Sequence, residues 1–297
     1  IKDAGRELDI GALYITDDGK TRLYVDVDTE TWDDFVLNYR QSAYNSVTID
    51  WGDGSAQESV GTSLLTTIRH TYAQSGAYMI TLTVAEGKAL RFGASDGSTM
   101  LIAMDEADMG RCAMLKKVEM GANIEFVNIA TFRGCARLES VSVLSGVPFD
   151  GSRLFEQCTT LRAIVVGGTF TISQSFYNCS NLRAIATPKG TTQRNDYAIA
   201  NTAVRQINLD MTAANQAQAL ERVHIKAVNG QVGDFSACRA LLEVTIPADA
   251  TTFVAAAFNG DNALRRVTCL GDIASIPAQV FQRCYPLRFV DFTHCTA

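Results

Sequence analysis

Eight cysteines give this chain side chains that could form disulfides, bind zinc or act as redox thiols. Six of them share one spacing, three residues after Phe or Met and three residues before Leu: Cys112, Cys135, Cys158, Cys179, Cys238 and Cys284. No two cysteines are separated by only two residues, which is the spacing of zinc and dithiol centres. The shared spacing therefore favours a repeated structural position over a chemical site.

Other copies of the same spacing place other small residues at the cysteine position, namely Asn201, Ala217 and Asp261. This exchange indicates a packing position at which Cys serves as a small buried hydrophobe. We therefore predict no metal site and no cofactor there. A disulfide that involves Cys269, Cys284 or Cys295 stays open.

Three histidines limit acid-base catalysis near neutral pH. His70 lies in a β-rich motif that favours a structural role, and neither His224 nor His294 accompanies a nucleophile motif with Ser or Cys. Phosphate-binding, dinucleotide-binding and zinc-protease motifs are also absent from the sequence. We predict that the chain has no catalytic residues and is not an enzyme.

The N-terminal part is acidic, since residues 1–88 hold 7 of the 26 Lys and Arg but 14 of the 32 Asp and Glu. The run from Asp26 to Glu30 begins like an EF-hand calcium loop, but Thr31 stands where the loop requires Gly. Solvated surface carboxylates are the simpler interpretation, and calcium binding by the acidic loops stays open. A chain of net charge −6 without a basic stripe also lacks the features of a nucleic-acid-binding protein.

The length and composition indicate a globular protein of two domains, with 297 residues and 47% hydrophobic content. No apolar run reaches the length of a transmembrane helix, so we predict no membrane insertion. The sequence starts at Ile1 rather than Met, which suggests that a signal peptide has been removed.

A pattern of the form F-x-x-C-x-x-L-x-x-V-x-V recurs through the C-terminal two-thirds of the chain. Counted at the cysteine position, nine copies begin at residues 112, 135, 158, 179, 201, 217, 238, 261 and 284. The step from 201 to 217 is the irregular one, and it predicts a distortion there. A constant period means that each copy is a unit that buries its apolar face only by stacking on its neighbours.

The spacing within one copy assigns its parts. Phe and Cys three residues apart fit a short helical or 3₁₀ turn, whereas Val-x-Val has the period of a strand. The predicted fold class is therefore mainly β with short helical turns, and the strands of about nine coils form a parallel sheet.

This repeat resembles the BspA-type leucine-rich repeats of bacterial surface proteins. The fullest matches are Phe235 to Pro247, FSACRALLEVTIP, and Ile276 to Phe292, IPAQVFQRCYPLRFVDF. The resemblance implies a leucine-rich-repeat solenoid over residues 109–297. The copies at 201 and 217 depart from it because they lack both Phe and Cys.

Three motifs mark the N-terminal part: Trp51-Gly52-Asp53-Gly54, His70-Thr71-Tyr72, and the alternating strand of Tyr78 to Val84. Together they resemble a PKD-type domain, which is an immunoglobulin-like β-sandwich. The resemblance implies a sandwich over residues 1–90, of which 1–18 cannot be placed. Residues 91–108 would be a linker and an N-terminal cap, with the cap at Met100 to Met109.

Residues that alternate with the core positions of each repeat strand should point outward and form an exposed ladder. The first half of this ladder begins with Lys117, Glu119, Ser140 and Ser142 and is small and apolar in its middle, with Ala163, Val165, Ala184 and Ala186. The second half carries charges and one aromatic ring, and it is the predicted binding face: Arg222, His224, Glu243, Thr245, Arg266, Thr268, Phe289 and Asp291. The simpler alternative is a solvated sheet face with no ligand.

These features predict a secreted or cell-surface bacterial protein without catalytic activity, whose repeats mediate adhesion or protein recognition and whose sandwich is a spacer. The expected partner is a protein or a host-surface ligand. Two alternatives stay open: a structural component of a phage or prophage tail, and a carbohydrate-binding module in the sandwich. The sequence sets neither the ligand nor the oligomeric state.

Overall fold

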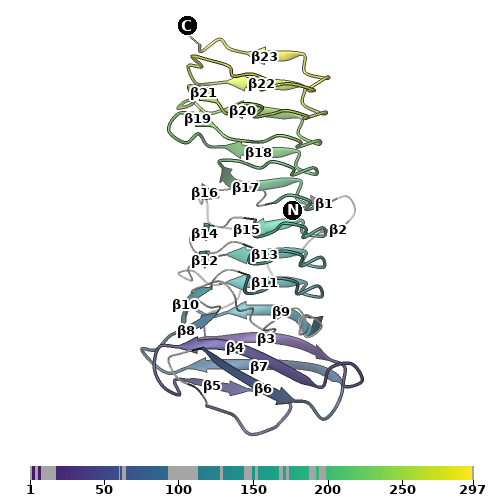
Figure 1. Ribbon diagram of the computed structural model, residues 1–297, viewed down its shortest axis with the longest axis vertical. Coiled ribbons are helices and arrows are strands. Elements are labelled where there is room, and N and C mark those ends of the chain that lie inside the picture. The colour runs from purple at the N-terminus through teal and green to yellow at the C-terminus, as the bar shows by residue number, and fades with distance from the viewer. Residues whose placement is uncertain are drawn as a thin grey trace.

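The computed structural model describes residues 2–3, 6–7, 18–59, 61, 65–92, 113–127, 130–143, 149–150, 153–166, 170–171, 174–186, 192–193 and 199–295. Figure 1 shows a tall stack of coils that stands on a broader N-terminal base. A separate short antiparallel pair is formed by β1 (Lys2–Asp3) and β2 (Arg6–Glu7).

The N-terminal base consists of two layers of antiparallel strands. One layer has the order β5 (Val47–Asp50), β7 (Gly76–Val84), β3 (Lys20–Val27); the other has the order β6 (Thr66–Thr71), β4 (Asp34–Gln41), β8 (Leu90–Phe92). Strand β3 alternates between buried and partly exposed residues, as a strand with one face on a core does. Trp51, Tyr39 and Tyr72 are among the largest fully buried side chains of this core.

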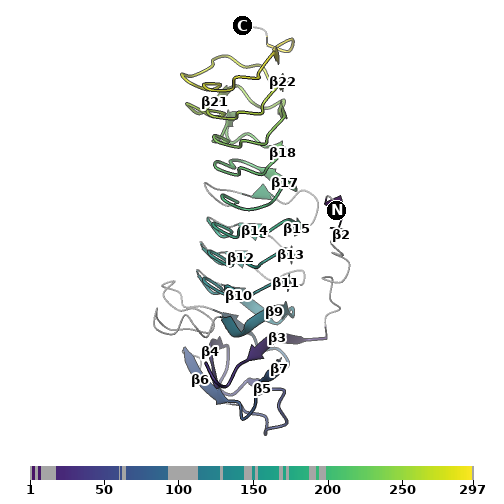
Figure 2. The same cartoon turned by 90° about the vertical axis from the view of Figure 1, so that its right-hand side faces the viewer.

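The stack above the base carries two columns of parallel strands, on opposite sides of the coils in Figure 2. The long column comprises β9 (Leu115–Met120), β11 (Ser140–Val143), β13 (Ala163–Val166), β15 (Ala184–Ala186), β17 (Gln206–Met211), β18 (Arg222–Ile225), β20 (Glu243–Ile246), β22 (Arg266–Cys269) and β23 (Phe289–Asp291). The other comprises β10 (Ile124–Val127), β12 (Phe149–Asp150), β14 (Phe170–Thr171), β16 (Thr192–Gln193), β19 (Gln231–Val232) and β21 (Thr252–Phe253). The Val-x-Val positions thus lie on strands, as their spacing predicts.

Both layers of the base continue into the stack. Strand β3 pairs with β7 on one side and antiparallel with β9 on the other, and β8 pairs with β4 on one side and parallel with β10 on the other. The two resulting sheets contain seven and six strands. The predicted cap at Met100 to Met109 and most of the predicted linker lie outside the described residues, and the domain boundary at residue 90 stays a prediction.

The irregular step in the repeat joins β17 to β18 and lies between two breaks in the long column, one between β15 and β17 and one between β18 and β20. The seven-stranded sheet ends at β15, and a separate sheet of β16, β17 and β18 follows. Within it, the pairing of β17 with β18 shifts register between Gln206 and Asp210. The predicted distortion is confirmed, because the four steps from Gln206 to Asp210 on β17 are opposite only two steps, from Arg222 to His224, on β18.

The Phe-x-x-Cys segments are turns rather than short helices. The amide of Cys135 donates to the carbonyl of Phe132 over 3.2 Å, and Cys158 repeats this bond to Phe155. Residues with positive φ stand directly before the cysteine position, including Gln157 at 65° and Asn178 at 62°. A left-handed residue cannot continue a right-handed helix, so each turn stays isolated. These i→i+3 bonds confirm the 3₁₀ form of the predicted turn, whereas no helical segment longer than one turn forms at these described positions.

The fifth copy also places its small buried residue one position later than the spacing suggested. Asn201 has φ of 55° and is exposed, so it matches the residue before the packing position. Thr202 is the buried residue, and its hydroxyl donates to the carbonyl of Ile199 over 2.8 Å. The assignment of Asn201 to the packing position is therefore wrong, whereas Ala217 and Asp261 are buried as expected. The number of nine coils and the immunoglobulin-like fold of the base both stay predictions.

Candidate binding face and the repeated core

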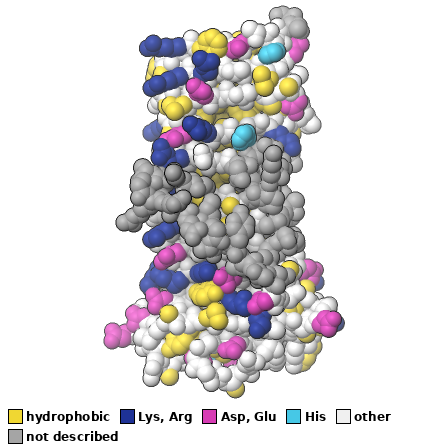
Figure 3. Space-filling model, turned by 180° about the vertical axis from the view of Figure 1, so that it is seen from behind, with side chains coloured by type: hydrophobic (Ala, Val, Ile, Leu, Met, Phe, Trp, Pro, Cys, Tyr) yellow, Lys and Arg dark blue, Asp and Glu magenta, His cyan; other side chains and the backbone are white. Residues whose placement is uncertain are grey.

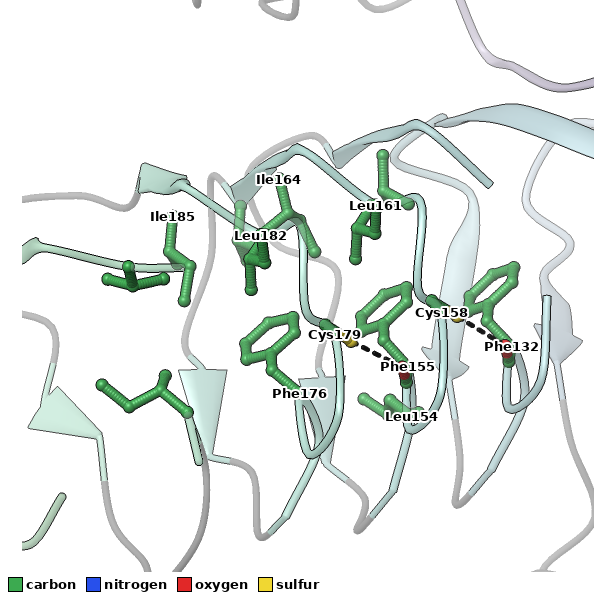
Figure 4. Packing of buried hydrophobic residues seen from close by; sticks show 14 of the residues in the cluster. Phe132, Leu154, Phe155, Cys158, Leu161, Ile164, Phe176, Cys179, Leu182 and Ile185 are labelled. Atoms are coloured by element: carbon green, nitrogen blue, oxygen red, sulfur yellow. Dashed lines mark hydrogen bonds between the residues drawn. The ribbon is translucent and has the colours of Figure 1, made fainter. Parts of the chain in front are cut away.

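Stacked phenylalanines form the spine of the coils. The ring centroids of Phe132 and Phe155 are 5.2 Å apart, those of Phe155 and Phe176 are 5.5 Å apart, and both pairs are nearly parallel. Phe235, Phe258 and Phe281 repeat this arrangement with spacings of 5.7 Å. Figure 4 shows the rings of three successive coils in one row from left to right, beside a row of Leu and Ile side chains.

The cysteine thiols connect successive coils. Cys158 donates its Sγ–H to the Phe132 carbonyl of the preceding coil over 3.0 Å, and Cys179 donates to the Phe155 carbonyl over 2.9 Å (Figure 4). Cys284 makes the equivalent bond to Phe258 over 3.0 Å. The cysteine position therefore supports packing, as the sequence indicated. Cys112 lies outside the described residues.

Burial makes these thiols poor nucleophiles. Desolvation raises the pKa of Cys179 and Cys269 to about 12 and that of Cys284 to about 11. Cys269, Cys284 and Cys295 are all free thiols, so the disulfide that the sequence left open does not form. Within the described part of the chain, no three His, Cys, Asp or Glu side chains are grouped as a metal site would require.

Thiol labelling of the folded protein at pH 8 should separate one cysteine from the others. We expect iodoacetamide to modify Cys295, which is partly exposed, while Cys135, Cys158, Cys179, Cys238, Cys269 and Cys284 react only after unfolding. Mass spectrometry of tryptic peptides, with and without urea, measures this difference. Rapid native labelling of Cys158 or Cys179 would contradict the packing role.

Asp261 occupies the cysteine position of its coil and is fully buried. Its Oδ1 accepts a hydrogen bond from the amide of Cys238 over 2.8 Å, while its Oδ2 has no hydrogen-bond partner. Desolvation raises the pKa of Asp261 to about 9, so the carboxyl group is protonated at neutral pH. A neutral acid can donate a hydrogen bond from Oδ2, as a thiol does from Sγ in the other coils.

His70 belongs to an aromatic cluster in the base. Its ring stacks on Trp51 with centroids 4.6 Å apart and meets the edge of Tyr72 at 4.7 Å. His70 Nε2 lies 2.8 Å from Asp53 Oδ2, and hydrogen bonds from Ser55 and then from His70 lower the pKa of Asp53 to about 2. These contacts fix the Trp-Gly-Asp-Gly turn, which gives His70 a structural role.

The predicted binding face lies on β18, β20, β22 and β23. Arg222, His224, Glu243, Thr245, Arg266 and Phe289 are exposed, and Thr268 and Asp291 are partly buried. Glu243, Arg266 and Phe289 are aligned on successive strands, as are Thr245, Thr268 and Asp291. The guanidinium of Arg266 lies 4.8 Å from the centroid of the Phe289 ring. The eight residues thus share one face, and their role in binding stays a prediction.

The first half of the outward ladder is not exposed. Ala163, Val165 and Ala184 are each at most 3% exposed and form a second buried cluster, against which Ala186 packs. Alternation sets the side of the sheet to which a residue points, but it does not set whether that side is covered. A row of Ala and Val with no polar member was the signal for a covered surface.

Sequence reasoning missed a row of residues that directly precede the strands. Arg265 and Arg288 are exposed neighbours in this row, since the amide of Arg265 donates to the Leu242 carbonyl and that of Arg288 donates to the Arg265 carbonyl. The only signal was the recurrence of Arg one residue before the outward position, at Arg162, Arg183, Arg205, Arg265 and Arg288.

Among the described residues, no helix is long and apolar enough to cross a bilayer.

Parallel strands that recur about once per 22 residues apart from the short step between β17 and β18, a stacked Phe core and a ladder of buried cysteines define a leucine-rich-repeat protein. Residues 109–220 and 219–296 match the BspA type leucine rich repeat region family, in six copies. The match covers more than half of the chain, which therefore belongs to this family. No enzyme family is indicated.

Two solved structures are similar to parts of the chain. One is a leucine rich cell surface protein from Faecalibacterium prausnitzii A2-165, with 14% identity and a TM-score of 0.29, covering 60% of this chain and 79% of the other. The second is a leucine-rich repeat protein from Bacteroides ovatus ATCC 8483, with 13% identity and a TM-score of 0.28, covering 74% and 84%. No match is found among curated proteins. At these TM-scores neither structure supports a conclusion about this chain.

Proposed function

We propose that this protein is displayed on a bacterial surface, or secreted, and that it recognises a protein ligand without catalysing a reaction. The observation that supports this most is the face on β18, β20, β22 and β23, where Arg222, Glu243, Arg266 and Phe289 are exposed on the strands of successive coils. Family membership supports the same role, because leucine-rich repeats generally bind proteins through extended surfaces.

We also propose that residues 1–90 form a PKD-like, immunoglobulin-like domain that holds the repeats away from the cell. The contacts of Trp51 with His70 and of His70 with Asp53 support it, since they join the two motifs on which the resemblance rests. Recovery of the native protein only from phage particles would instead support a tail component. Specific glycan binding on an array would support a carbohydrate-binding role for the base.

A capture experiment tests the binding face. The full chain is immobilised, a mixture of extracellular host and bacterial proteins is passed over it, and each protein retained is purified and measured by surface plasmon resonance. The triple variant Arg222→Glu, Glu243→Arg, Arg266→Glu should bind a genuine partner at least about tenfold more weakly, because losing charge complementarity at one pair costs on the order of 1 kcal/mol or more.

Asp249→Asn is the matched control, since Asp249 is exposed and lies in the turn after β20, off the face. It should leave the affinity unchanged. Equal affinity of the triple variant and the native chain would contradict the face, and retention of no protein at all would contradict protein recognition.

A further inference from the structure

The C-terminal coils carry arginines that form no ion pair with a described residue, although the charge of Arg266 acts on Asp291 from a longer range. Arg222, Arg239, Arg265, Arg266, Arg283 and Arg288 are all exposed, and none forms an ion pair with a described residue. The coils nearer the base differ, because Lys116 pairs with Glu139, Arg133 with Glu156 and Arg137 with Asp26. The positive charge of the C-terminal coils is therefore free to meet an external anion.

Three of these arginines are close neighbours across two coils. Arg265 and Arg288 are joined through their backbones, with the Arg288 amide 3.2 Å from the Arg265 carbonyl, and Arg266 follows Arg265 on β22. Adjacent strands lie about 4.8 Å apart, so like charges here repel one another in the free protein. Two acidic residues lie near Arg266: Glu243 is aligned with it on the neighbouring strand, and Asp291 on β23 feels its charge, yet neither forms an ion pair with it. A bound anion would relieve this repulsion.

Exposed apolar side chains lie on the same coils as these arginines. Leu242, whose carbonyl accepts the Arg265 amide, is 42% exposed. Phe289, whose ring contacts the guanidinium of Arg266, is 45% exposed, and Tyr285 on the last coil is 83% exposed. Seen from behind, the upper coils in Figure 3 show Lys and Arg side chains along one edge with hydrophobic side chains beside them. The combination of Arg with aromatic and aliphatic residues is that of protein interface centres.

We propose that this surface, the arginine edge, docks an acidic segment of a protein partner; the edge comprises Leu242, Arg265, Arg266, Tyr285, Arg288 and Phe289. Carboxylates of the segment pair with the guanidinium groups, which bind carboxylates through two parallel hydrogen bonds. An apolar side chain of the segment covers Leu242 or Tyr285. This inference rests on the proposed protein recognition and names the chemistry of its partner.

An acidic protein fits this edge better than an acidic polysaccharide does. A polysaccharide supplies carboxylate or sulfate groups at regular intervals but no aliphatic side chain to cover Leu242. The positions in the edge are also all Arg with no Lys, and Arg suits a desolvated interface because it is more weakly hydrated than Lys. The edge lies along the side of the stack, so a further coil after β23 would leave Arg265 and Arg266 open.

The test uses the full chain and three polymers as probes in fluorescence anisotropy: a Glu-Tyr copolymer, poly-glutamate and chondroitin sulfate. We expect the copolymer to bind most tightly, poly-glutamate more weakly, and both to weaken as salt rises to about 0.15 M, since exposed charges are screened. The double variant Arg265→Glu, Arg288→Glu should lose at least about tenfold of the copolymer affinity. The milder pair Arg265→Gln, Arg288→Gln removes the two charges without reversing them and should lose less of the copolymer affinity. It serves as a second variant in case the Glu pair does not fold.

Arg162→Glu is the matched control, because Arg162 is an exposed member of the same row, without an ion pair, on a coil near the base. If Arg162→Glu lost as much copolymer affinity as the double variant does, binding would depend on overall charge and not on the arginine edge. Tighter binding of chondroitin sulfate than of the copolymer would contradict the assignment of a protein partner. A captured protein that depends on Arg222 and Glu243 but not on Arg265 and Arg288 would refute the edge and leave the proposed function intact.

Discussion

Asp261→Asn is expected to stabilise the fold at pH 7 by up to about 4 kcal/mol, since each pKa unit corresponds to about 1.4 kcal/mol. The carboxyl has a pKa of about 9 in the folded chain against 3.8 in its ordinary state. Its contribution to stability is therefore fully present below pH 3.8 and is lost as the pH rises through about 9. Asn keeps the acceptor for the Cys238 amide and supplies a donor in place of Oδ2, without a proton to take up.

Urea denaturation at several pH values between 4 and 9 measures this effect. The native chain should lose stability along this range relative to Asp261→Asn, and the two should converge near pH 4. Asp249→Asn, which removes an exposed carboxyl from the same part of the stack, should run parallel to the native chain. If the free energies of unfolding of Asp261→Asn and of the native chain changed in parallel with pH, the pKa of Asp261 would be the same in the folded and the unfolded chain.

Phe155→Ala is expected to reduce the free energy of unfolding by about 3–5 kcal/mol, the usual cost of removing a buried Phe side chain. Phe155 is fully buried and is stacked between Phe132 and Phe176, and its carbonyl accepts the thiol of Cys179. The variant therefore opens a cavity that touches three coils. Loss of one ring should loosen neighbours on both sides, because each coil contacts only the adjacent ones.

Urea unfolding followed by far-ultraviolet circular dichroism measures the change. Phe289→Ala is the matched control, since Phe289 is 45% exposed on the last strand and should cost little. Similar losses for Phe155→Ala and Phe289→Ala would mean that the stacked rings do not dominate the stability of the coils.

The sequence predicted most of the core but less of the surface. The period located the strands and the packing position, because an apolar residue that recurs at a fixed interval must face the same interior in every coil. The period assigned the wrong residue at Asn201, because Asn201 has positive φ and the next residue, Thr202, occupies the buried packing position. It left open whether each turn was a short helix or a 3₁₀ turn, since spacing alone does not show that residues such as Gln157 adopt a left-handed conformation, which ends the segment after one turn.

The sequence predicted the exposure of the outward face correctly in the C-terminal coils and wrongly in the coils nearer the base. Alternation correctly placed Arg222, Glu243 and Arg266 at exposed positions, but it also predicted exposure for Ala163 and Val165, which are buried. The row that contains Arg265 and Arg288 escaped notice because it lies before the strands, outside the alternating pattern. The missing acidic partners became visible only once the ion pairs of other coils were known.

The direct pairing of β3 with β9 and of β8 with β10 gives the assembly of this chain a direction. A parallel coil has no local hairpin to start it, so the first coil is the most difficult one to form. Here two finished strand edges of the base act as a template on which that coil can nucleate. Folding should then propagate coil by coil from β9 toward β23, and the last coils should be the first to fray.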